Sequence, residues 1–220
     1  MERYWKIEKM NLKYHIPLHV FVCVLMLCVS PLLMGVENLS AVDTAKVLER
    51  YVALIGIIML VPVFLPEQDM GIRELVYAKY TKSAEVYLIR LFGNIFILAV
   101  FLGAYIFMLK SNQCGFPAVK YYLGTFAEMI FLGGIGLFFY GVSDNLVIGY
   151  MASTVYYIMA VGSGKKYLKI LYPFSMSMES YTEKICLIVT AAGMIAGGIY
   201  FRCRRKKEAG ILYHLKNLKN

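Results

Sequence analysis

The chain has few charged residues and no long polar segment. Only 17% of its 220 residues are charged and 60% are hydrophobic, whereas soluble domains carry about 25% charged residues. The mean hydropathy is +0.62. This balance excludes a soluble globular protein, and no polar stretch is long enough to bury a core of its own. A single membrane domain that uses residues 1–220 is therefore expected.

The residues of thiol and metal chemistry are also scarce. The five cysteines form no CxxC pair, so neither a disulfide framework nor a zinc site is indicated. Of the three histidines, His15 and His19 share a helical face, but Ile16 stands where an HExxH zinc protease carries glutamate. We expect no metal site in this chain.

Motifs of catalysis are missing as well. The segment 162–166 imitates the end of a phosphate-binding loop, but Met159 replaces the first glycine and Lys166 replaces the hydroxyl residue. The sequence shows neither a GxSxG motif nor the paired acids of intramembrane proteases. The chain is therefore predicted to bind no cofactor and not to be an enzyme by itself.

Long apolar runs dominate the sequence instead. A membrane span takes about 20 helical residues, and the second run reaches this length when Val47 and Leu48 extend it upstream. We predict an all-α integral membrane protein with six transmembrane helices, a polar outer loop over 37–50 and a bend at Pro62. The six runs are Ile16–Val36, Tyr51–Leu65, Val86–Leu109, Tyr121–Val142, Asn145–Val161 and Ile185–Phe201.

The net charge of +9 is explained by membrane topology, so no nucleic-acid partner is expected. With both termini cytoplasmic, most lysines and arginines lie on the inner side, as the positive-inside rule requires. Lys165, Lys166 and Lys169 then lie outside, against the rule, but moving them inside would place the basic tail 202–220 outside. We therefore predict that both termini are cytoplasmic.

Three polar regions flank or interrupt the spans. Residues 1–15 carry basic residues at helical spacing and predict an amphipathic interfacial helix, although ordinary flanking charges are an alternative. The stretch 67–83 follows Pro66, which cannot continue a helix, and predicts a short cytoplasmic surface helix between spans two and three. The segment 162–184, with Pro173, predicts a re-entrant outer segment between spans five and six.

Glu128 is the acidic residue well inside an apolar run. An intramembrane carboxylate is costly and points to a functional site; the alternatives are a hydrogen-bonded packing residue or a protonated side chain near the outer interface. Asn94 and Ser153 are the candidate polar partners for Glu128. In the sixth run, Gly193 and Gly197 form a GxxxG motif that favours close helix packing.

The layout of spans and surface helices resembles the membrane subunits of type-2 ABC exporters. The shared local pattern is Phe64-Leu-Pro-Glu67 followed by Gly71, Glu74-Leu75 and Arg90. The resemblance implies that Glu67 and Gly71 set the start of a coupling helix between spans two and three. It further implies that this helix contacts an ATPase through the packing residues Ile72, Leu75, Val76 and Tyr77 and the polar residues Arg73 and Glu74.

The same resemblance implies that separate subunits hydrolyse ATP and form the substrate path. ATP and magnesium are expected on a separate cytoplasmic ABC ATPase, in two copies, while a second permease chain, identical or homologous, helps to enclose the substrate path. The expected setting is the lipid of a bacterial plasma membrane, and the expected substrate is hydrophobic or peptide-like. Two alternatives remain: a membrane enzyme that uses Glu128 on lipid or peptide, and a non-catalytic scaffold or sensor.

Overall fold

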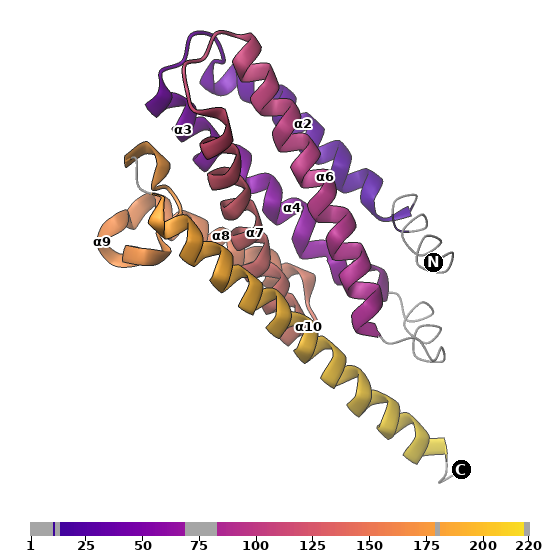
Figure 1. Cartoon of the computed structure of the whole chain (residues 1–220). Helices are drawn as coiled ribbons and strands as arrows, with labels where there is room; N and C mark the ends of the chain where they lie inside the picture. The colour runs from indigo at the N-terminus through magenta and orange to yellow at the C-terminus, as the bar shows by residue number, and fades with distance from the viewer. Residues whose placement is uncertain (1–10, 12–13, 69–82, 179–180, 218–220) are drawn as a thin grey trace.

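The computed structural model describes residues 11, 14–68, 83–178 and 181–217, and every regular element in these ranges is helical (Figure 1). The elements are α2 (Ile16–Met34), α3 (Ala41–Arg50), η1 (Val52–Leu54), α4 (Ile55–Leu60), η2 (Val61–Glu67), α6 (Ser83–Ser111), α7 (Ala118–Ser143), α8 (Leu146–Ser163), α9 (Lys165–Leu168), η3 (Lys169–Leu171), η4 (Met176–Met178) and α10 (Thr182–Asn217).

Five helical segments are long and apolar enough to cross a membrane, which confirms the prediction of an all-α membrane protein. They are Ile16–Met34, Ala41–Glu67, Ser83–Ser111, Ala118–Ser143 and Thr182–Arg205. A sixth candidate joins Leu146–Gly162 to Lys165–Leu171 through a bend of 113°. The count of six therefore depends on whether this bent pair is one broken span. Most of the predicted interfacial helix 1–15 and most of the stretch 67–83 lie outside the described residues.

The second span begins earlier than predicted, because residues 41–50 form α3 and not a loop. The Ser40 side chain accepts a hydrogen bond from the Asp43 backbone N–H at 3.2 Å and so caps the helix. Buried Ala45 and Leu48 then lie at helical spacing on its inner face. Near Pro62 the span changes from α-helix to the tighter η2, where the sequence predicted a bend.

Helix α7 is the centre of the bundle and packs against α10, α8 and α4. Within one apolar 18-residue stretch of each span, the buried share is 72% in α7 and 78% in Ala41–Glu67, but only 17% in α2 and 28% in α10. Figure 1 shows α10 running beside α7 and extending beyond the other helices at its C-terminal end. Most of α7 therefore lies inside the protein, while α2 and α10 present most of their apolar surface outward.

Glycines let the neighbours of α7 approach its backbone closely. A Cβ at Gly133 would lie 2.6 Å from the Gly56 carbonyl oxygen on α4, and a Cβ at Gly149 on α8 would lie 2.8 Å from the Gly136 carbonyl oxygen. Likewise, a Cβ at Gly198 on α10 would lie 3.0 Å from the Phe138 Cα. Small residues at helix crossings are the usual basis of packing in lipid.

The GxxxG pair of α10 is only partly involved in these contacts. Gly197 lies against the Phe138 ring, whereas Gly193 is exposed, and a Cβ there would meet no atom within 4 Å. The closest approach of α10 to α7 is thus made by Gly198, the residue after the motif.

Gly56→Ala is expected to lower the free energy of unfolding by about 1–3 kcal/mol or more, because the new Cβ would overlap the backbone of Met129. Backbone atoms cannot rotate away, so α4 and α7 must separate. Gly193→Ala is the matched control and should cause no loss. Thermal unfolding of the detergent-solubilised chain measures both variants. Equal losses would contradict the packing described above.

One end of the bundle gathers the start of α2, the end of η2, the start of α6 and the connection between α7 and α8 (Figure 1). Burial, and then the positive charge of Arg90 on α6, lower the pKa of His15 just before α2. The opposite end holds α3, the beginning of α10 and the connection between α6 and α7. Each end contains a buried ionic cluster.

Candidate functional site

The first buried cluster, called the lysine cluster here, consists of Glu49 on α3, Glu128 on α7 and Lys184 on α10. Their relative exposures are 1%, 0% and 5%. The Lys184 ammonium donates to Glu49 Oε1 at 2.9 Å and also to Glu128 Oε1 and the Pro173 carbonyl oxygen. These bonds use all three donors of the ammonium group. One cation therefore joins three helices in the protein interior.

The lysine cluster also fixes the chain between η3 and α10. The Glu49 carboxylate accepts hydrogen bonds from the backbone N–H groups of Met176 at 2.6 Å and Ser177 at 3.4 Å. Together with the bond from Lys184 to the Pro173 carbonyl, these contacts hold the segment 173–177 against α3 and α10. Side chains of this segment are buried, including Phe174 and Met176. The segment is thus packed inside the protein and not free in solvent.

The cluster carries two carboxylates for one ammonium group. Glu128 Oε2 is buried and has no hydrogen-bond partner among the described residues. A buried ion pair is stable only when its remaining polar atoms are compensated, and removal of one member leaves an uncompensated charge. Lys184 is consequently the residue on which the other two depend.

The partners expected for Glu128 were wrong. The Asn94 side chain donates to the Met59 carbonyl at 2.7 Å, and the Ser153 hydroxyl donates to the Leu132 carbonyl at 2.8 Å. Both are buried and bind neighbouring backbone. The partner of Glu128 is instead Lys184, which the sequence analysis placed in the outer segment.

The second cluster, called the arginine cluster here, consists of the buried residues Glu67, Tyr87 and Arg202 and the partly exposed Asp144. The Tyr87 hydroxyl donates to Glu67 Oε2 at 2.5 Å, and Arg202 Nε lies 3.7 Å from the same oxygen. Arg202 Nη1 also pairs with Asp144 Oδ1. The cluster therefore connects the end of η2, the start of α6, the turn between α7 and α8, and α10.

Aromatic rings enclose the Arg202 guanidinium. Its Cζ lies 5.6 Å from the ring centroid of Phe64 and 5.7 Å from that of Tyr140, within the range of cation–π attraction. The Phe64 ring also packs edge-on against Tyr87, with centroids 4.9 Å apart. Arg202 is 3% exposed. A residue that the sequence presents as part of a basic tail is thus a buried member of the bundle.

Of the predicted coupling residues, Glu67 is described and lies in the arginine cluster. The residues Gly71, Ile72, Arg73, Glu74, Leu75, Val76 and Tyr77 lie outside the described part of the chain. Sequence reasoning missed Glu49, Lys184 and Arg202 as interior residues, and Asp144 as the partner of Arg202. For Glu49 a signal existed, since the Ser40 cap and the spacing of Ala45 and Leu48 mark a buried helical face.

Within the described residues, no group of three or more histidine, cysteine, aspartate or glutamate side chains could hold a metal ion. Comparison of the chain with models of protein families, with curated proteins and with solved structures finds no match. The two clusters do not present an exposed nucleophile or acid to a substrate. Instead, the two clusters link helices to one another, and this linkage is the property that is most relevant to function.

Proposed function

We propose that the chain is the permease subunit of an ABC exporter in a bacterial plasma membrane. It would form the path for a hydrophobic or peptide-like substrate, such as an antimicrobial peptide or drug, while a separate ATPase supplies the energy. The observation that carries this proposal is the position of Glu67. Glu67 lies immediately before the polar stretch that resembles a coupling helix, and it accepts a hydrogen bond from Tyr87 near the start of the next span, α6.

Glu67, two residues before the stretch 69–82, is held by contacts with other helices. Glu67 bonds to Tyr87 on α6, and Arg202 links Glu67 to the turn between α7 and α8 through Asp144. A displacement of the stretch by an ATPase would act on three helices at once. A helix inserted in a mobile loop would transmit little movement to the spans.

Helix α10 offers a route from one end of the bundle to the other. Arg202 and Lys184 lie on this same helix, and a separation of about 18 residues corresponds to about 27 Å of helix. Because each residue belongs to one buried cluster, α10 connects the cluster beside the proposed ATPase with the cluster that holds the segment 173–177. Movement at the first end can thereby reach the segment at the second.

The remaining parts of the proposal follow the family resemblance. Both termini and residues 67–83 would lie in the cytoplasm, and the segment 162–184 would be the re-entrant outer segment. Two ATPase subunits would bind ATP and magnesium, and a second permease chain would pack against the outward apolar faces. The alternative of an enzyme that uses Glu128 requires substrate access to a side chain that is 0% exposed.

Glu74→Lys is expected to abolish coupling to the ATPase. The charge reversal introduces repulsion into the proposed contact. A repulsion of only about 1.4 kcal/mol would lower the affinity of the chain for the ATPase about tenfold. Affinity purification from the native membrane, followed by partner identification and an ATPase assay, measures this loss.

Glu37→Lys is the matched control for that experiment. Glu37 is exposed between α2 and α3, at the opposite end of the bundle, so the same charge change should leave ATPase binding intact. If the wild-type chain purifies without an ATPase, the permease proposal fails. If the ATPase is retained equally by both variants, the residues 71–77 are not its contact.

A further inference from the structure

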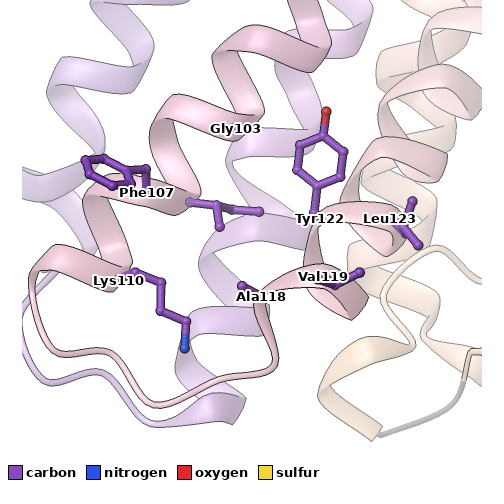
Figure 2. Close-up of a pocket in the computed structure, with 8 residues that line it drawn as sticks. Gly103, Phe107, Lys110, Ala118, Val119, Tyr122 and Leu123 are labelled. Carbon is purple, nitrogen blue, oxygen red and sulfur yellow. The ribbon is translucent and has the colours of Figure 1, made fainter.

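A groove of about 400 Å³ lies between α6 and α7 at the end of the bundle that holds their connection (Figure 2). Its walls include the exposed side chains of Phe107, Val119 and Leu123. Its floor is deepened by Gly103, where a Cβ would meet only the Tyr122 ring, at 3.8 Å. The groove is thus an apolar channel on the outer surface of two membrane spans.

The dimensions of the groove suit a hydrocarbon chain. From Gly103 to Lys110 the groove follows about seven residues of α6, which is about 10 Å of helix. The hydroxyl of the lining residue Tyr122 is already bonded to the Ala99 carbonyl oxygen at 3.1 Å. Apart from Lys110, the described lining side chains therefore offer an acyl chain apolar contacts.

One end of the groove is positively charged. Lys110 lies in the last turn of the candidate span Ser83–Ser111, and a lysine at the end of a span can extend its ammonium group to the lipid headgroups. Its Nζ donates to the Phe116 carbonyl oxygen at 2.6 Å, which leaves two further N–H donors on the ammonium. Figure 2 shows the Lys110 side chain extending toward the connection between α6 and α7.

The N-terminus of α7 adds positive potential at the same end. Ala118 and Val119 line the groove and are the first two residues of this 26-residue helix. The preceding Pro117 provides no side-chain cap, and N–H groups in a first helical turn lack intrahelical acceptors. None of the eight lining residues is acidic. The charge at this end complements an anionic headgroup.

We propose that this groove binds one anionic phospholipid. An acyl chain lies along Gly103 and Phe107, and the phosphate accepts hydrogen bonds from Lys110 and the first turn of α7. The proposal does not depend on transport activity, since it concerns the outward surface of α6 and α7 alone. The bound lipid fills the space between the two helices at their connected ends.

Native mass spectrometry of the full chain, titrated with phosphatidylglycerol or phosphatidylcholine, tests the proposal. One phosphatidylglycerol should be retained, with about fivefold higher affinity than phosphatidylcholine. Lys110→Gln should remove this preference, because a lysine near a membrane surface contributes about fivefold toward an anionic lipid. Gly103→Leu should weaken both lipids about tenfold by occupying the space of about two methylene groups.

Two control variants separate this site from general attraction. Lys120 is exposed in the first turn of α7, but its side chain does not line the groove, and its Nζ lies 5.8 Å from the Tyr181 ring centroid. Ala104 is exposed on α6 beside Gly103 and also lies outside the lining. Lys120→Gln and Ala104→Leu should leave binding nearly unchanged. Equal losses from Lys120→Gln and Lys110→Gln, or no loss from Gly103→Leu, would overturn the proposal.

Discussion

Lys184→Met is expected to lower the free energy of unfolding by about 3–5 kcal/mol, the usual effect of removing one member of a buried ion pair. Methionine retains a similar length and fills the same space. The loss therefore reports the missing charge: Glu49 and Glu128 would remain together in the interior without their shared cation. Thermal or denaturant unfolding of the detergent-solubilised chain gives the difference.

The neighbouring pair of Lys165 and Glu183 provides the control. Lys165 Nζ lies 2.7 Å from Glu183 Oε1, but the lysine side chain is 43% exposed. An ion pair of this kind contributes about 0–1 kcal/mol, so Lys165→Met should have little effect. Adding Glu128→Gln to Lys184→Met should restore part of the lost stability, because one of the two uncompensated carboxylates is then neutral. Similar losses for the two lysine variants would contradict the central role of Lys184.

Arg202→Met is expected to lower the free energy of unfolding by a comparable amount, about 3–5 kcal/mol. It should also remove the link between Glu67 at the end of η2 and Asp144 in the turn between α7 and α8. Without the guanidinium, Glu67 and Asp144 have lost the cation between them, and the rings of Phe64 and Tyr140 have lost their cation–π partner. Arg202→Lys keeps the charge but not the planar fork, so it should recover stability only in part.

Arg205→Met is the control for this second prediction. Arg205 is exposed and donates to the Val142 carbonyl oxygen, so its replacement should change stability by less than about 1 kcal/mol. In the proposed complex with an ATPase, Arg202→Lys should also reduce transport-stimulated ATP hydrolysis more than it reduces ATPase binding. If Arg202→Lys lowers stability but leaves stimulation intact, the arginine cluster holds the fold together without transmitting movement.

The positions of the spans could be predicted from the sequence, because hydropathy reports directly how a segment partitions between water and lipid. The runs that contain α2, α6, α7 and α10 were recognised in this way. The charge of Glu128 within its run also identified it as an interior polar residue. The GxxxG motif predicted close packing of the last span, but the closest contact with α7 is made by Gly198, the residue after the motif.

The polar network could not be predicted, because its members are far apart in the chain. Lys184 bonds to Glu128 over 56 residues and to Glu49 over 135 residues. In the sequence, Glu49 and Lys184 stand at the edges of apolar runs, where charged residues are usually exposed. Only the crossing of α3, α7 and α10 decides that these edges are inside the protein.

Arg202 illustrates the same division. By itself the sequence determined that a basic group ends the last apolar run, which is a local property of charge and hydropathy. The tertiary structure decided which of these basic residues is buried: Gly198, one turn earlier, brings α10 so close to α7 that Arg202 reaches Asp144 and Glu67. Hydropathy acts on each segment alone, whereas burial and pairing of charge depend on which segments pack together.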